Sequence, residues 1–159
     1  MLSYLTEQLN ESLSHHGVVT DVILRSEHSL VEEEETREVE IRFMEREEEG
    51  KPEAKIYLSL LPDQESCEVE AEIAYASEGV SDDAAARLWE KARAVIPEIS
   101  LTEKKRYLEP GKCVESSIVL DTHFIVQMPA NEEEAGALDQ LLERFSADLG
   151  EILRIGTIR

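Results

Sequence analysis

The chain of 159 residues carries 36 acidic and 16 basic side chains, a formal net charge of −20 at pH 7. Such a surface repels nucleic acid and anionic lipid, which argues against both as partners. Leu, Ile, Val and Phe make up 43 of the 159 residues, well above the roughly 20% below which disorder is the better prediction. We therefore expect one folded, acidic domain over residues 1–159.

The start of the chain has the periodicity of an amphipathic helix. Leucines recur there every three or four residues, at Leu2, Leu5, Leu9 and Leu13. This spacing places them on one helical face, and Gly17 suits the C-terminal end of the helix. Residues 18–31 are apolar and β-branched at their start, which predicts a first strand or two short ones. Residues 18–35 therefore leave room for an extra N-terminal strand.

Three later segments alternate between apolar and charged residues. The apolar set comprises Val39, Ile41, Phe43, Ile56, Leu58, Leu60, Val69, Ala71, Ile73 and Tyr75. Charged residues, mostly glutamates, stand between many of them, so the strands have one apolar and one acidic face. This pattern is typical of an antiparallel sheet that is covered on a single side.

A second helix is expected over residues 82–96. Ser81 is a good N-cap, and acidic residues in the first turn favour the helix dipole. Pro97 then stops the helix. A basic cluster follows around a turn at Pro110-Gly111, and comprises Lys104, Lys105, Arg106 and Lys112.

Residues 113–128 follow as one long extended segment or a pair of strands. Both faces of this segment are largely apolar, so it requires cover on both faces. Asn131 and Glu134 then resemble a capping box. The last helix has an apolar stripe made of Leu138, Leu142, Phe145, Leu149 and Ile152. The expected fold is α+β, an antiparallel β-sheet packed against helices in the order α-β-β-β-α-β-β-α, with an extra N-terminal strand left open.

No catalytic, cofactor or metal motif stands out in the sequence. His15 and His16 are adjacent, so on a helix they point about 100° apart, and we interpret them as a helix-end pair. Cys67 and Cys113 lack metal-ligand spacing and are too few for a disulfide framework. The default compartment is therefore the cytoplasm, with both thiols reduced, and neither a signal peptide nor a membrane span is expected.

The residues that carry a resemblance to a known family are spread over the whole chain. They are LTEQLNESL, VEIRF, KIYLSLL, VEAEIAYA, DDAAARLWEKARAVIP, GKCVESSIVLDTHFIVQMP and NEEEAGALDQLLERFSADLGEIL. In element order and acidity the chain resembles the type III secretion chaperone-like superfamily, which includes the class I secretion chaperones and related bacterial sensory-transduction regulators. The resemblance implies a non-enzymatic homodimer that holds an extended, apolar client segment. The implied dimer contact comprises Leu88, Trp89, Ala92, Phe124, Ile125 and Val126.

The physical argument points the same way, because the chain has more apolar residues than a one-sided sheet and three helices require. We therefore expect a chaperone-like, protein-binding module without a cofactor. A first alternative is an acidic mimic of nucleic acid that inhibits a basic protein. Its carboxylate row would comprise Glu38, Glu40, Glu68, Glu70 and Glu72. A second alternative is a ligand sensor or enzyme that uses His123, Asp121 and the turn at 104–112, if these groups converge in a pocket.

Overall fold

The computed structural model of the chain describes residues 1–33, 35–76 and 80–156. These residues form three helices and six strands in the order α-β-β-β-β-α-β-β-α. The predicted α+β fold is confirmed, and the extra N-terminal strand is present. The elements are α1 (Leu2–Ser14), β1 (Val18–His28), β2 (Glu35–Met44), β3 (Ala54–Leu60), β4 (Ser66–Ala76), α2 (Asp82–Val95), β5 (Ser100–Glu109), β6 (Lys112–Gln127) and α3 (Glu132–Arg154).

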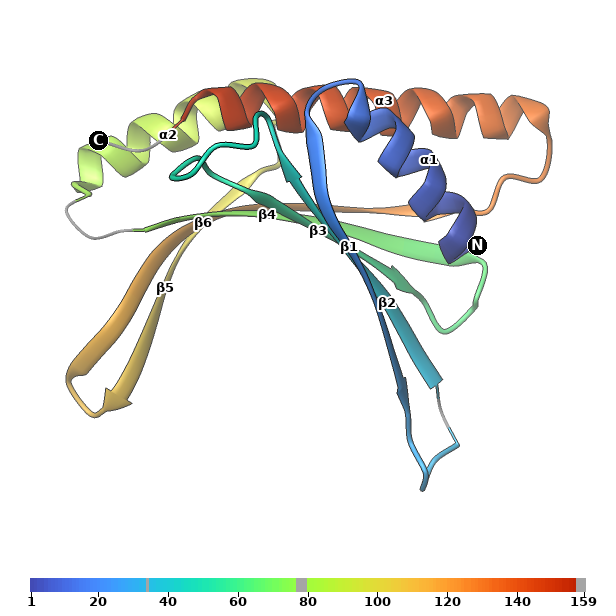
Figure 1. Cartoon of the computed structure of the whole chain (residues 1–159), viewed down its shortest axis with the longest axis horizontal. Helices are drawn as coiled ribbons and strands as arrows, with labels where there is room; N and C mark the ends of the chain where they lie inside the picture. The colour runs from blue at the N-terminus through green and yellow to red at the C-terminus, as the bar shows by residue number, and fades with distance from the viewer. Residues whose placement is uncertain (34, 77–79, 157–159) are drawn as a thin grey trace.

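The strands form one antiparallel sheet in the order β1-β2-β3-β4-β6-β5. All three helices lie on one side of it, and the sheet arches away beneath them (Figure 1). The two end hairpins project from this arch, away from the helices. We call them the β1–β2 leg (residues 24–33 and 35–39) and the β5–β6 leg (residues 103–118). The face of the sheet that is turned away from the helices is the open face.

The core lies between the sheet and the helices, as the alternation predicts. Cross-strand partners on the helix side are apolar in successive strands, for example Phe43 with Ala54, Ala54 with Ile73 and Ile73 with Leu120. All four are buried. The predicted stripes of α1 and α3 are also buried, which confirms that both helices turn these faces inward. Burial of these side chains is the main driving force for the fold.

Two helix starts have the predicted caps. The Oγ of Ser81 accepts a hydrogen bond from the Ala84 N–H at 3.1 Å. The Oδ1 of Asn131 accepts one from the Glu134 N–H at 2.9 Å, while the Glu134 carboxylate accepts from the Ala130 N–H at 2.7 Å. The capping box is therefore present, with its return bond one residue earlier than expected.

The sequence predicted either one long extended segment or a pair of strands over residues 113–128, and the structure has the first of these. Residues 113–128 do not contain two strands, because nearly all of them belong to the single long strand β6. Its partner β5 includes the basic residues that were expected to precede the pair. Gly111, with φ +83°, makes the tight turn between the two strands, a conformation that favours glycine. The second face of β6 has no helix over it, and Ile125 is 60% exposed there.

Gly17 provides a test of the packing between the end of α1 and β2. A Cβ at this position would lie 2.6 Å from the ring of Phe43, which is fully buried, and closer still to the carbonyl oxygen of Met44. Gly17→Ala should therefore lower the free energy of unfolding by about 1–3 kcal/mol, measured by denaturant titration. Gly136→Ala is the matched control, because nothing lies within 4 Å of a Cβ at that exposed helical position. The control should raise stability by about 0.5–1 kcal/mol, and equal losses in both variants would contradict the close contact at Gly17.

Candidate functional site

The β5–β6 leg extends beyond the helix-covered part of the molecule. Leu101 is half-buried, and every later residue of β5 is exposed. The sequence explains this boundary, because residues 103–106 are all charged and have no apolar side chain to bury beneath α2. The helix side of the sheet therefore stays accessible here.

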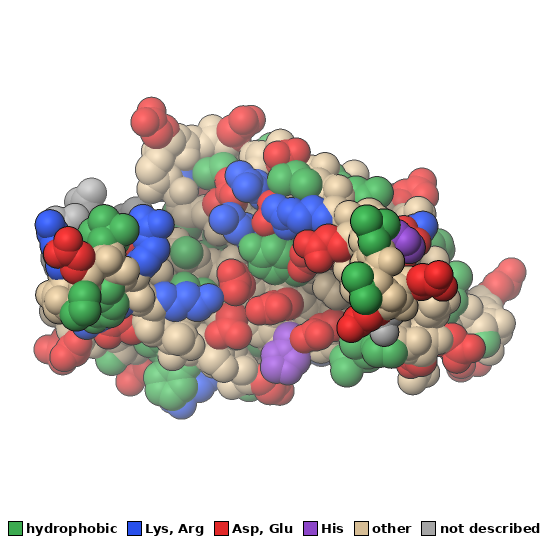
Figure 2. Space-filling model, turned by 90° about the horizontal axis from the view of Figure 1, so that it is seen from below, with side chains coloured by type: hydrophobic (Ala, Val, Ile, Leu, Met, Phe, Trp, Pro, Cys, Tyr) green, Lys and Arg blue, Asp and Glu red, His purple; other side chains and the backbone are tan. Residues whose placement is uncertain are grey.

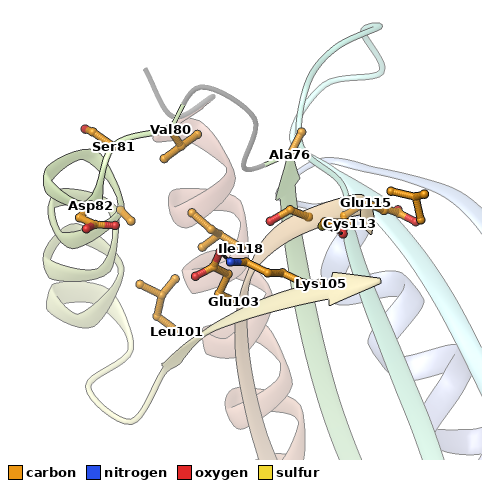
Figure 3. A pocket seen from close by; sticks show the side chains of 13 residues that line it. Ala76, Val80, Ser81, Asp82, Leu101, Glu103, Lys105, Cys113, Glu115 and Ile118 are labelled. Atoms are coloured by element: carbon orange, nitrogen blue, oxygen red, sulfur yellow. Dashed lines mark hydrogen bonds and ion pairs between the residues drawn. The ribbon is translucent and has the colours of Figure 1, made fainter. Parts of the chain in front are cut away.

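A groove of about 830 Å³ lies between the start of α2 and this part of the sheet (Figure 3). Its lining residues come from β4, α2, the two residues that precede α2, β5 and β6. The apolar ones are Ala76, Val80, Ala85, Leu101, Val114 and Ile118, and the others are Ser81, Asp82, Glu103, Lys105, Cys113, Glu115 and Ser116. The groove is thus apolar in part, with charged groups along it, as is usual for sites that bind organic ligands or peptide side chains.

The charges in and beside the groove are paired within the chain. Lys105 Nζ lies 3.3 Å from the Glu103 carboxylate, and that hydrogen bond raises the lysine pKa. Arg106 Nε lies 3.3 Å from Glu115. Asp82 is in the first turn of α2, where it provides the negative charge that the helix dipole favours. These ion pairs leave little net positive charge to attract an anionic ligand.

The chemistry of the groove does not indicate catalysis. The Cys113 thiol is exposed and donates to the backbone carbonyl oxygen of Glu115 at 3.3 Å. Among the described residues that line the groove, none is a histidine that could act as a base toward this thiol. Cys67, the other free cysteine, is buried, and burial raises its pKa to about 11.

The open face contains the predicted carboxylate row, but basic side chains interrupt it. Glu40 is 3% exposed, and its carboxylate lies 3.3 Å from Arg42 Nε and 3.5 Å from Arg25 Nη2. Lys104 Nζ lies 3.5 Å from Glu72. Figure 2 shows basic and acidic side chains intermixed on this face. A nucleic-acid mimic requires free carboxylates at phosphate-like positions. Because basic side chains pair with part of this row, the structure supports the acidic-mimic alternative less than the sequence did.

His123 and Asp121 lie on the open face, on the same side of β6. They are the cross-strand partners of Glu70 and Glu72. Burial raises the pKa of Glu70, and the neighbouring carboxylates add to this effect while His123 opposes it. Lys112 begins β6, nine residues before Asp121, so the two are roughly 30 Å apart along an extended strand. Lys104, at the other end of the cluster, lies on the open face with its Nζ 3.5 Å from Glu72, so the groups that the sensor or enzyme alternative requires converge only in part.

The six residues expected at the dimer contact do not form one surface. Leu88, Ala92 and Val126 are buried in this chain's own core. Phe124 packs its ring edge-on against Phe145 of α3, at 5.0 Å between centroids. Ile125 is exposed on the open face. The buried positions pack in the chain's own core, and their periodicity on an amphipathic element could not distinguish core from interface.

Trp89 is half-buried, and its surroundings explain why it stays in place. Its indole Nε1–H donates to the carbonyl oxygen of Ile99 at 3.1 Å, which fixes the loop between α2 and β5. The guanidinium carbon of Arg93 lies 4.4 Å from the ring centroid, within reach of a cation–π interaction. The ring therefore has a structural role in the single chain.

A cluster of His15, His16 and Glu143 joins the end of α1 to α3. The Nε2 of His16 lies 2.6 Å from Glu143 Oε1, and the Nδ1 of His15 lies 3.2 Å from Oε2. Both imidazoles thus share one carboxylate, which the sequence did not predict because Glu143 lies far along the chain. Within the described part of the chain, no group of three or more His, Cys, Asp or Glu side chains is arranged to hold a metal ion. The cluster therefore serves to hold the two helices together.

Comparisons with protein-family models, with curated proteins and with solved structures found no match for this chain. The resemblance to the secretion chaperone-like superfamily therefore stays a prediction. None of the helices among the described residues has both the length and the apolar character needed to cross a bilayer.

Substitution of Trp89 distinguishes a structural role of its ring within one chain from a role in a dimer interface. Trp89→Ala should lower the free energy of unfolding by about 2–4 kcal/mol, because it removes a half-buried ring and leaves the Ile99 carbonyl without its donor. The particle mass in light scattering should not change relative to the wild type. A loss of mass without a loss of stability would instead assign Trp89 to the predicted dimer contact.

The His15–His16–Glu143 cluster makes stability depend on pH. Burial alone would raise the pKa of Glu143, but hydrogen bonds from His16 and His15 outweigh it and hold the pKa below its usual value. A depressed carboxyl pKa stabilises the fold above the unfolded value near 4.5, and this stabilisation is lost as the pH falls through the folded value. Glu143→Gln should therefore cost about 0.5–1 kcal/mol at pH 6, a small figure because the carboxylate is partly exposed.

Chemical denaturation of wild type and Glu143→Gln between pH 3 and pH 7 measures this difference. The two stabilities should approach each other toward pH 3. Glu151→Gln, an exposed position on the same helix, is the control and should track the wild type throughout. A constant difference between wild type and Glu143→Gln across the whole range would contradict the assigned role of the carboxylate.

Proposed function

We propose that this chain is a non-enzymatic, chaperone-like protein-binding module of the cytoplasm that works as a homodimer and holds an apolar segment of a partner protein. The observation that carries the proposal is the groove between α2 and the β5–β6 leg. It is open, partly apolar and lined by residues from four elements and from the segment just before α2. An extended segment with apolar side chains at alternate positions has the shape and chemistry to occupy such a groove.

Several features of the surface support this assignment. Val114 is 40% exposed inside the groove, and Leu108 is 74% exposed near the end of the same leg. Clustered apolar side chains at the surface are typical of binding sites in proteins that fold alone. The net charge of −20 keeps such a surface in solution, because copies repel one another at long range.

The charge also defines the contacts that a client can make. The bases near the groove are already paired with Glu72, Glu103 and Glu115. A client therefore gains little from charge of its own near the groove, and affinity has to come from apolar contact. The proposed binding differs in this respect from the acidic-mimic alternative, in which attraction between a basic protein and carboxylates dominates and is screened by salt.

Affinity capture from a lysate at about 0.1 M and 1 M NaCl, with immobilised full-length chain, tests the proposal. We expect a partner that stays bound at high salt. Val114→Glu, which places a charge in the groove, should reduce its recovery at least tenfold. Val31→Glu is the control, since Val31 is 92% exposed on the opposite leg, and it should bind as the wild type does. Partners that are released at high salt, and that are retained equally by both variants, would favour the acidic-mimic alternative.

A further inference from the structure

The two edges of the sheet differ in how they are protected against pairing with another chain. β5 forms one edge and has three consecutive basic residues at 104–106. Charged side chains of this kind are a common protection of edge strands. β1 forms the other edge, and its first seven residues, at 18–24, contain Asp21 as their one charged residue. A bulge lies between Val19 and Asp21, and from Asp21 to His28 the strand is regular.

Apolar side chains continue on the helix side of the sheet as far as the β1 edge, where the helices no longer cover them fully. Val22 and Leu24 are the cross-strand partners of Ile41 and Val39, so they lie on the helix side of the sheet. The two partners in β2 are buried, whereas Val22 is 45% exposed and Leu24 is 67% exposed. An open groove of about 610 Å³ lies between the first part of β1, up to Val22, and Asn10 and Ser14 of α1. The edge thus combines an apolar strip with backbone groups that have no neighbouring strand.

The sequence of β1 is complementary to itself when two copies run antiparallel about Ile23. Asp21 then lies opposite Arg25 of the second copy, and Val22 lies opposite Leu24, each pair occurring twice by symmetry. Ile23 lies opposite its own counterpart. Both apolar pairs are on the helix side and both charge pairs are on the open face, as the side-chain alternation requires.

Two neighbouring registers also keep the helix-side residues of both copies on the same side of the joined sheet, but their cross-strand pairs are less favourable. Pairing about Leu24 places Asp21 opposite Glu27 of the second copy, a like-charge pair. Pairing about Val22 places Asp21 opposite Ile23 and leaves Arg25 opposite Val19. The register about Ile23 therefore gains both charge and apolar complementarity. Arg25 already lies 3.5 Å from Glu40 and 3.8 Å from Glu38, and is 48% exposed, so its guanidinium has donors left for a further carboxylate.

We infer that the β1 edge is the site at which a second copy of this chain binds, in an antiparallel β1–β1 pair centred on Ile23. The two sheets join into one continuous sheet with all helices on the same side. This inference deepens the homodimer part of the proposed function and moves the contact away from α2 and β6. Because each copy has a net charge of −20, long-range repulsion opposes the dimer and added salt screens it.

Sedimentation equilibrium of the full chain at 0.05 M and 0.5 M NaCl is the test. We expect a monomer–dimer equilibrium that shifts toward the dimer at high salt. Leu24→Lys should weaken association at least tenfold, while Leu108→Lys, at a similarly exposed position on β5, should leave it unchanged. Thermal unfolding of each variant shows that it is folded.

A cross-link tests the register independently of these variants. In a Cys113→Ser background, Ile23→Cys should form an intermolecular disulfide under mild oxidation, because directly opposed strand positions have Cα atoms within disulfide reach. Leu108→Cys in the same background should not.

A monomer at both salt concentrations, or a dimer that is unaffected by Leu24→Lys and not linked through Ile23→Cys, would overturn the inference. A monomeric chain that retains a different protein through Leu24 would overturn it too, since the edge would then accept a foreign strand. Salt-resistant capture that depends on Val114 would leave the client-binding part of the proposed function intact in either case.

Discussion

One-sided cover of the sheet is the constraint on which the rest of this structure depends. The central strands have apolar side chains on one face and mostly charged or polar ones on the other, and all three helices pack on the first face. The open face has to be hydrated, so it is lined with glutamates whose repulsion is reduced by Arg25, Arg42 and Lys55 nearby. Burial and the carboxylates around it raise the pKa of Tyr57 to about 12. Burial is the largest cause of this shift, and Glu72, Glu40 and Glu38 add to it.

The helices cover only part of the length of the end strands, and this partial cover creates the surfaces of interest. Cover ends near Leu101 on one side and near Val22 on the other. Beyond these limits the sheet continues as the two legs, with its helix side accessible. The α2 groove and the β1 edge are thus two results of a single geometric fact. They lie on opposite ends of the sheet, so a client in one does not obstruct a second copy at the other.

The architecture could be predicted from the sequence because it depends on local periodicity. The leucine stripes, the alternating strands and the caps at Ser81 and Asn131 all follow from which residues are three, four or two positions apart. The candidate site depends on other information. Periodicity shows that Leu88 and Ala92 face something apolar, but it cannot show whether this is the chain's own core or a partner. The groove, the Lys104–Glu72 ion pair and the His15–His16–Glu143 cluster join residues distant in sequence, and no spacing rule reaches them.

The β1 edge could be predicted from the sequence only in part. Its apolar start was visible in the sequence, yet its meaning required the strand order, because the same residues in a central strand would be ordinary core. Once β1 is known to be an edge, the absence of lysine along residues 18–24 becomes informative, since natural sheets usually protect such edges. A strongly acidic chain can leave this edge unprotected, because the long-range repulsion between copies already opposes indiscriminate stacking. Contacts that overcome this repulsion must then be locally neutral and apolar, and the Asp21–Arg25 and Val22–Leu24 pairs of β1 meet both conditions.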